Sequence, residues 1–490
     1  MEPLEQNSDK AIPHHDARFA SRNRLVITIL IISTFIVILN ETLMIVAIPY
    51  LMNDLGVSAS AAQWLTTAFL LTMAVVIPIT GFLLQRINTK PAFILAMSLF
   101  SLGTLIAALS SGLEMLVVGR VIQATGTAVM MPLLMTTIMM LVPPESRGKF
   151  MGNISLVIAV APAVGPTVAG FILSHFEWPW LFWTILPIAL SALILGYVRI
   201  VNVSTPRYAP LDILSVLLSM VAFGGLVYGL SALGQVEDGD SSLALNIVIV
   251  GAIGMALFIW RQIRLQPNDK ALLDLRTFQS RGFTLSLAMM TVAMMLFFGS
   301  LILLPIYIQK VQMLDTLQTG LIFLPGGLVM GLLAPFVGAL YDKHGPRLLI
   351  IPGAFVVSGV LWAMTLLNAE TWWGYILIGH ILISGGLAFI TTPLFTASLS
   401  SIPQKFYSHG SAILGSIQQL AGAAGIALLV AIMTLQTNAL ISEGVTPINA
   451  LAGGISKAFI WGAAFSIVMI LTAFFVPNDK PSQQLHEEME

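Results

Sequence analysis

Long apolar segments of close to 20 residues alternate with short polar stretches over nearly the whole chain. A helix of about 20 apolar residues spans the hydrocarbon core of a bilayer, so each segment predicts one transmembrane helix. The pattern therefore predicts an all-α polytopic membrane protein, and an even number of spans places both termini on one side. We expect fourteen spans, at roughly 25–48, 62–84, 91–111, 114–138, 150–174, 179–199, 211–233, 243–263, 284–308, 317–340, 347–367, 372–396, 409–434 and 456–476.

The composition agrees with a membrane protein. Hydrophobic residues make up 57% of the 490 positions, charged residues only 9%, and the mean hydropathy is +0.92. A soluble chain carries more charge than this, so we expect the lipid bilayer as its surroundings. The chain has no cysteine, which excludes disulfides and thiol chemistry. Because it also has no nucleotide-binding loop and no metal-ligand spacing, we expect no cofactor, no metal, no ATP drive and no nucleic-acid partner.

Lysine and arginine are distributed unevenly between alternate loops. If the N-terminus is cytoplasmic, nineteen of the 22 basic residues fall in cytoplasmic segments, whereas Lys310 and Lys457 fall outside and Arg120 lies within a helix. Basic loops remain on the cytoplasmic side, so the pattern predicts a multi-pass protein of the cytoplasmic membrane with both termini in the cytoplasm. Most tryptophans lie at predicted outer helix ends, as in an interfacial belt. The longest outer loop, roughly 435–455, has room for a small hairpin.

A repeated loop divides the chain in two. The segment "GFLLQRINTKPAFIL" (81–95) aligns without gaps with "GALYDKHGPRLLII" (338–351). The copies lie eight helices apart, which predicts two six-helix bundles with two helices inserted between them, an arrangement common in transporters. The predicted divisions are a cytoplasmic tail 1–24, a bundle 25–200, inserted helices 201–265, a cytoplasmic linker 266–283, a second bundle 284–477 and a cytoplasmic tail 478–490.

Four further segments carry a family resemblance: "LNETLMIVAIP" in the first helix, "LVVGRVIQATGTAV" in the fourth, "APAVGPTVAGF" in the fifth and "EWPWLFWTILPI" entering the sixth. With the repeated loops, the chain resembles the fourteen-helix drug:proton antiporters of the major facilitator superfamily, the branch of lincomycin and quaternary-ammonium exporters. The resemblance implies the major facilitator fold, alternating access, small amphipathic substrates and protons as the transported species, and the proton gradient as energy source. An adaptor protein occurs in this branch, but the sequence does not require one.

Glu41 is the one acid that we place well inside a predicted membrane helix. A charged carboxylate in hydrocarbon is costly, and such residues usually serve function, so we interpret Glu41 as the proton-coupling group. The alternative is a permanently paired structural carboxylate. The position where the family usually has its acid holds Asn40, one residue and about 100° away around the helix, and we assign no proton to Asn40.

Arg120 is the one base that we place inside a membrane helix. Arg120, Gln123 and Thr127 are spaced three and four residues apart, which puts them on one polar stripe. In the resemblance, this arginine belongs to a motif implicated in proton transfer, so we pair it with Glu41. The alternative is a structural role, in which the guanidinium bonds backbone carbonyls and holds helices together.

Two further elements are interpreted as conformational. The fifth helix carries the segment that marks antiporters in the family, within a ridge of small residues suited to close packing; ordinary packing is the alternative. The repeated loops are interpreted as gates between the bundles, although positive-inside topology alone also explains their charge. The first copy has Gln85 where the family usually has an acid, and the second copy keeps the acid. The residues concerned are Pro162, Gly165, Pro166 and Gly170 in the fifth helix, and Gly81, Arg86, Lys90, Gly338, Asp342, Lys343 and Arg347 in the loops.

The substrate cavity is predicted from polar residues inside helices. Gln418 lies on a glycine-rich face of the thirteenth helix, and His380 lies near the middle of the twelfth, where it could equally be a satisfied core residue. Methionines of the ninth helix offer an adaptable apolar surface, with core or lipid packing as the alternative. The residues expected to line the cavity are Asn40, Gln123, Thr127, His380 and Gln418.

These features favour proton-coupled efflux of neutral or monovalent cationic amphipathic compounds, since a single membrane acid argues against divalent cations. An exporter of a cellular metabolite or lipid would need the same cavity. A passive facilitator fits only if Glu41 is structural. A membrane enzyme would need clustered acids, histidines or metal ligands in a surface loop, which the sequence lacks.

Overall fold

The computed structural model describes residues 14–203, 206, 211–233 and 242–478. Within these ranges the secondary structure is helical, without strands, and 14 helices are long and apolar enough to cross a membrane. Helices suit such a chain because every backbone N–H and C=O in hydrocarbon must find its partner inside the segment. The predicted all-α architecture and number of spans are confirmed. Of the two predicted tails, residues 1–13 and 479–490 fall outside the described residues, and 14–24 belong to the first helix.

The helices form two groups of six with an insertion between them. The first group is α1 (His14–Leu55), α2 (Ala59–Arg86), α3 (Thr89–Ala108), α4 (Leu113–Leu141), α5 (Arg147–His175) and α6 (Trp180–Arg199). The insertion is α7 (Ile213–Ser219), η2 (Met220–Gly224) and α8 (Gly225–Leu233), which together make one span, and α9 (Ser242–Leu265). The second group is α10 (Arg281–Ile306) with η5 (Tyr307–Val311), α11 (Thr316–His344), α12 (Arg347–Met364), α13 (Trp373–Ser400), α14 (Tyr407–Ser442) and α15 (Pro447–Phe475). Short connecting turns are η1 (Pro144–Ser146), η3 (Gln266–Asn268), η4 (Leu275–Gln279) and η6 (Gln404–Phe406).

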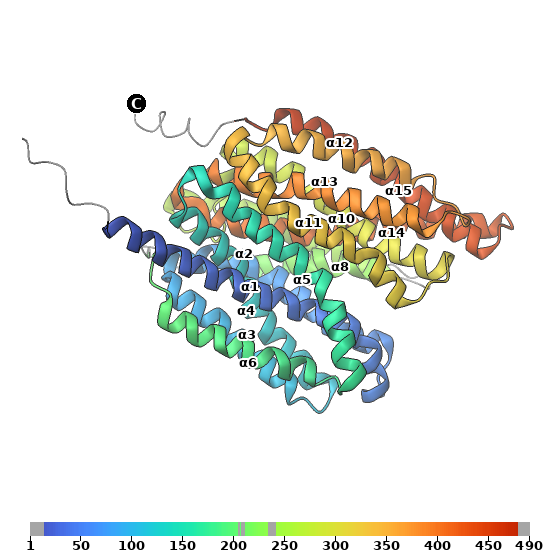
Figure 1. Ribbon diagram of the computed structural model, residues 1–490, viewed down its shortest axis with the longest axis horizontal. Coiled ribbons are helices and arrows are strands. Elements are labelled where there is room, and N and C mark those ends of the chain that lie inside the picture. The colour runs from blue at the N-terminus through green and yellow to red at the C-terminus, as the bar shows by residue number, and fades with distance from the viewer. Residues whose placement is uncertain (1–13, 204–205, 207–210, 234–241, 479–490) are drawn as a thin grey trace, which may run out of the picture.

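The two groups pack their helices in equivalent pairs. α1 packs on α5 as α10 packs on α14, α3 on α4 as α12 on α13, and α3 on α6 as α12 on α15. The groups lie at an angle, close together at the end where α1 begins and α15 finishes and further apart at the other end (Figure 1). We call the first end the basic end, because the lysine- and arginine-rich loops are there, and the second the far end.

The inserted hairpin bridges the two groups. Gly224 lies beside Leu71 and Val75 of α2, and the ring of Tyr228 stacks on that of Trp64 with centres 5.9 Å apart. α8 also packs against α14 of the second group. The hairpin therefore covers the line along which α2 and α14 meet.

The connection between α14 and α15 is a hairpin, as the length of the predicted loop allowed, but the two helices themselves form it. Instead of an outer loop over 435–455, both helices continue beyond the predicted spans and are joined by residues 443–446, with Gly444 at φ 86°. Gly454 packs closely on Thr437, and Gly453 on Leu440, so the extended ends form a helical hairpin. The sequence prediction used membrane-length apolar segments, and therefore stopped each helix where the polar residues begin.

Candidate functional site

Arg120 of α4 is buried in a cluster of neutral groups, with only 1% of its surface exposed. Its Nη1 donates to Gln123 Oε1 (2.7 Å) and Asn40 Oδ1 (3.2 Å), and its Nε donates to the carbonyl oxygen of Leu65 (3.4 Å). The guanidinium also lies over the ring of Phe69, 4.0 Å from its centre. These bonds use the Nε and Nη1 donors of the guanidinium, which stays charged when buried.

A second set of hydrogen bonds orients Gln123, one of the residues that accept from Arg120. Gln123 donates from Nε2 to Thr104 Oγ1 of α3 (2.8 Å), which fixes its Oε1 toward Arg120. α3 comes this close because Gly103 faces the backbone of Gln123 without a side chain. Thr127 donates to the carbonyl oxygen of Gln123 (3.0 Å), so the predicted polar stripe is one connected network. Thr104 had no signal in the sequence, because its role depends on how α3 packs on α4.

Glu41 lies next to Asn40 on α1 but does not bond Arg120 directly. The structure gives Glu41 no hydrogen bond or ion pair with any residue that it describes, and part of the side chain is exposed. The charges of Glu41 and Arg120 nevertheless interact electrostatically. The arginine therefore acts on the carboxyl through its field, while Asn40, which we expected in the cavity, is the direct partner of the arginine.

Gly165 of α5 has no room for a side chain, because a residue of α1 packs against it. Thr42 donates to the carbonyl oxygens of Leu39 (2.8 Å) and Ala161 (3.4 Å), and its side chain fills the space where a Cβ of Gly165 would lie. α5 thus packs directly beside Glu41. Pro162 is exposed, and Gly170 has open space around it; the side chain of Pro166 falls outside the described residues.

At the basic end, α5 and α11 make a charged contact between the two groups. Asp342 accepts hydrogen bonds from the backbone N–H groups of Gly148 (2.7 Å) and Lys149 (3.0 Å), in the first turn of α5. Such N–H groups have no partner within their helix, and a carboxylate also complements the positive helix end. The contact requires Gly148 and Gly338, since a Cβ on either would overlap the carbonyl oxygen of the other.

The contact between α5 and α11 stops near the middle of both helices. Gly327 still faces Ala163. Nearer the far end, Gly170 and Gly320 face open space: a Cβ added at either would have no described atom of another segment within 4 Å. The groups are therefore in contact at the basic end and separated at the far end, in agreement with Figure 1.

The equivalent contact between α2 and α14 has no carboxylate. Gln85 donates from Nε2 to the carbonyl oxygen of Lys405 (3.2 Å), and a Cβ at Gly81 would lie 3.2 Å from Ala412 and 3.3 Å from His409. A carboxylate at position 85 would face an oxygen acceptor and repel it. The missing acid in the first repeated loop thus has a structural reason.

Two basic residues of the repeated loops, Arg347 and Lys90, make hydrogen bonds within their own groups. Arg347 donates from Nε to the carbonyl oxygen of Val476 at the end of α15 (2.6 Å), and the backbone N–H of Lys90 donates to Asn202 after α6 (3.2 Å). The guanidinium of Arg86 lies 5.9 Å from the Phe82 ring centre, and Lys343 is exposed. Among the predicted gate residues, Asp342, Gly338 and Gly81 contact the other group.

Comparison with known proteins places this geometry in a family. Residues 30–426 match the family model described as Major Facilitator Superfamily. The chain belongs to the Major Facilitator Superfamily. It is 38% identical over 460 residues to the lincomycin resistance protein LmrB of Listeria monocytogenes, covering 93% of this chain and 97% of the relative. It is 28% identical to the probable multidrug resistance protein EmrY of Escherichia coli, covering 81% and 77%.

Solved structures of this superfamily share the fold. The proton:xylose symporter XylE superposes with a TM-score of 0.64 at 14% identity, covering 94% of this chain and 97% of that one. The human organic anion transporter MFSD10 gives a TM-score of 0.65 at 15% identity, covering 93% and 99%. With the family match and the named relatives, the protein is a multi-pass major facilitator transporter and not an enzyme.

Most residues predicted to line the transporter's cavity are buried in this conformation. Asn40, Gln123, Thr127 and His380 expose 6% of their surface or less. His380 packs on Phe323 with ring centres 4.3 Å apart. Gln418 alone of the five is partly exposed, and its Nε2 contacts Met294 Sδ at 3.8 Å. A lining role for the other four stays a prediction for another conformation.

We expect Asp342→Asn to weaken the basic-end contact of this transporter. Hydrogen bonds to a charged group contribute about 1.5–3 kcal/mol, and asparagine keeps one acceptor oxygen without the charge. If the contact between α5 and α11 loses about 1.4 kcal/mol of stability, the ratio of open to closed contact rises roughly tenfold. Spin labels on cysteines introduced at exposed Arg199 and Gln404, one in each group, measure this ratio in the naturally cysteine-free chain.

The control for this measurement is Asp315→Asn. Asp315 caps α11 at the far end through the N–H of Gln318 (2.7 Å), so it has the same chemistry without a contact between the groups. An equal shift in both variants would show that Asp342 acts only within α11.

Proposed function

We propose that this transporter is a proton-coupled exporter of amphipathic neutral or monovalent cationic compounds. The proposal is supported by the relatives, which are named as lincomycin resistance and probable multidrug resistance proteins. The observation that carries the coupling is the Arg120 cluster: a buried cation whose hydrogen-bond partners are neutral, with the Glu41 carboxyl close enough to feel its charge. We also propose that the basic end faces the cytoplasm, with both termini, in the cytoplasmic membrane.

The charge of the cluster gives Glu41 two distinct states. With Glu41 ionised, the arginine and the carboxylate balance each other, and the carboxylate favours a cationic or polar ligand nearby. With Glu41 protonated, the positive field of Arg120 is uncompensated and disfavours a cation, because charges interact strongly at low dielectric. Protonation from the far side thus favours release there, and deprotonation toward the cytoplasm favours renewed binding.

The conformation described is suited to the release step. The groups are in contact at the basic end and separated at the far end, which supports proton access to Glu41 from the far end. One charge moving through 100 mV provides about 2.3 kcal/mol, before any contribution from the pH gradient. Protons and small amphipathic substrates are the only partners that the proposal needs; an adaptor is not required.

Glu41→Gln tests the proposal, since glutamine keeps the size of the side chain and cannot release a proton. In liposomes with an imposed pH gradient, we expect gradient-driven accumulation of ethidium or lincomycin to fall at least tenfold, while ligand binding and exchange without a gradient persist. The control is Glu114→Gln, an exposed acid in the first turn of α4. Unchanged accumulation in Glu41→Gln would make Glu41 structural, as in a passive facilitator, or place the coupling elsewhere.

A second candidate is the export of a cellular metabolite or lipid, with drugs carried incidentally. The same Arg120 and Glu41 arrangement serves either substrate. Accumulation of a cellular amphiphile in the absence of drug, lost in Glu41→Gln, would favour this candidate.

A further inference from the structure

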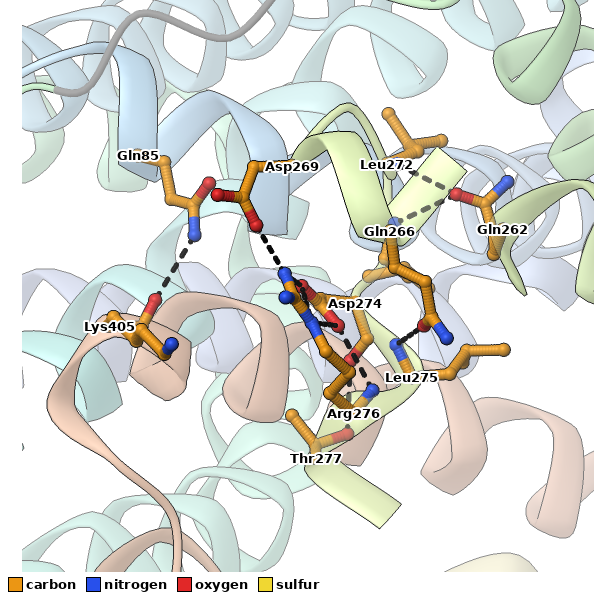
Figure 2. A network of polar contacts seen from close by, with 11 residues as sticks. Gln85, Gln262, Gln266, Asp269, Leu272, Asp274, Leu275, Arg276, Thr277 and Lys405 are labelled. Carbon is orange, nitrogen blue, oxygen red and sulfur yellow. Dashed lines mark hydrogen bonds and ion pairs between the residues drawn. The ribbon is translucent and has the colours of Figure 1, made fainter. Parts of the chain in front are cut away.

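The segment Gln266–Ser280, which joins α9 to α10, is a folded strap at the basic end. Gln262 of α9 is fully buried. Its Oε1 accepts hydrogen bonds from the backbone N–H groups of Leu272 (2.7 Å) and Leu273 (3.3 Å). Its Nε2 donates to Ser215 Oγ at the start of α7 (2.9 Å). Gln266 receives the N–H of Leu275 (3.1 Å) in the same way (Figure 2). These bonds fix the backbone of the strap to the inserted hairpin.

Charged contacts close the strap on itself. Arg276 forms ion pairs with Asp274 and with Asp269, as Figure 2 shows. These hydrogen bonds raise the pKa of Arg276 above its ordinary value, so the guanidinium remains charged at any physiological pH. Arg276 also lies 5.3 Å from the centre of the Phe406 ring, immediately before α14. The strap is thereby held against the second group as well.

The strap lies over the line where α2 meets α14. A Cβ at Gly81 of α2 would lie 3.2 Å from the side chains of both Ala412 of α14 and Leu273 of the strap, and 3.3 Å from Nδ1 of His409. The strap and α14 therefore both enclose this glycine of α2. Where the α5–α11 contact uses Asp342, this contact uses the strap.

His409 is buried at the centre of this contact, with 3% of its surface exposed. Its ring interacts with the backbone of Leu272, and because that N–H is already donated to Gln262, we infer that the partner is the carbonyl oxygen. Nδ1 has no hydrogen-bond partner among the described residues, so we infer that Nε2 carries the proton of the neutral ring. Nδ1 faces the backbone of Gly81.

A proton on Nδ1 has no acceptor in the closed contact. The strap groups that interact electrostatically with His409 are Asp274, Asp269 and Arg276, and both carboxylates already bind Arg276. Of the other elements packed on α14, α2 carries Arg86, α10 carries Arg281 and η6 carries Lys405, and none of these cations can accept a proton. A buried imidazolium with an unsatisfied N–H is therefore strongly disfavoured here.

We propose that the strap and His409 form a proton-sensitive latch on the α2–α14 contact: the contact closes only with neutral His409, and protonation of His409 holds it open. α2 and α14 belong to different groups, so any separation at the basic end removes Gly81 from Nδ1 and admits water to the ring. That this end senses the cytoplasm rests on the proposed function; the latch itself rests on the contacts. Acidification by the incoming protons would then slow the return to the closed state.

The size of the effect follows from linkage. In the open state the hydrated imidazole titrates near the usual histidine value of about 6.5. The closed state binds no proton at Nδ1, so it loses population as the pH falls through that value. Between pH 8 and pH 5.5, the ratio of open to closed contact is expected to rise about tenfold.

The test uses the full-length protein in lipid nanodiscs with spin labels at positions 199 and 404. A Glu41→Gln background removes the proposed coupling site, so the result does not depend on whether Glu41 couples transport. We expect the long-distance population to rise about tenfold from pH 8 to pH 5.5, and to stay constant when His409→Gln is added. Glutamine keeps an N–H for the Leu272 carbonyl and does not titrate.

The control is His344→Gln, which removes an exposed histidine at the end of α11, in the other contact. It should leave the acid response intact. The latch is wrong if the parent shows no acid-induced opening, which needs no variant to fold, or if His409→Gln opens as the parent does. Loss of the response in His344→Gln instead would assign it to the α5–α11 contact.

Discussion

Arg120→Ala is expected to lower the free energy of unfolding by about 3–5 kcal/mol. The substitution leaves Asn40 Oδ1 and Gln123 Oε1 buried without their donor, and each unsatisfied acceptor costs about 1–3 kcal/mol. It also empties the space beneath the Phe69 ring. Arg120→Lys should fall between alanine and wild type, because a single ammonium cannot reach the acceptors from three helices at once. Thermal unfolding in detergent measures both.

Arg264→Ala is the control for this prediction. Arg264 also lies over an aromatic ring, that of Trp260 at 4.1 Å, but its side chain is exposed and covers no buried acceptor. Its loss should change stability by less than about 0.5 kcal/mol. If Arg120→Ala were equally mild while transport failed, the arginine would serve transport alone, and its structural role would be refuted.

Gly338→Val is expected to prevent closure of the basic end and to reduce transport at least tenfold. The new Cβ overlaps the carbonyl oxygen of Gly148, which is helix backbone and cannot move aside as a side chain would. Overpacking of this kind costs about 1–3 kcal/mol, and every 1.4 kcal/mol changes the ratio of open to closed states tenfold. The spin-label pair should report a longer distance, and liposome uptake should fall in parallel.

Gly320→Val separates this effect from a general loss of helix packing. It lies in the same helix, in open space near the far end, so the substitution meets nothing in the conformation described. The label distance at the basic end should stay unchanged. A normal distance in Gly338→Val would mean that the two helices do not need this contact to close.

The fold was predictable where the bilayer imposes a length on each helix. Fourteen apolar segments became 14 candidate spans because a helix shorter than the membrane leaves backbone groups unsatisfied. The ends of α14 and α15 were not predictable in this way. Beyond the membrane, helix length depends on packing such as that of Gly454 against Thr437, which only the paired helices reveal.

The candidate site was predictable within one helix and not between helices. The spacing of Arg120 and Gln123 indicated a shared face, and the structure bonds them at 2.7 Å. The partners from other helices depend on where those helices pack. Gly148 has no functional side chain, and the Asp342 carboxylate that its N–H binds lies 194 positions away in the sequence.

His409 was missed for a related reason. It follows the polar start of α14, where a histidine looks like part of an exposed loop. The strap and Gly81, which contact it, come from two distant segments. The sequence shows that position 409 is a histidine, but its burial depends on how α2, α14 and the strap pack together.

The joined ends of α14 and α15 also offer a practical handle. At about 1.5 Å per residue, the 36 residues of α14 measure about 54 Å, whereas the hydrocarbon core is about 30 Å thick. Because α14 begins at the basic end, most of the excess stands in water at the far end, as a stiff pair of helices ending in the turn 443–446. An antibody fragment raised against that turn would add rigid mass outside the detergent belt, giving single-particle images of this small protein a feature by which to align.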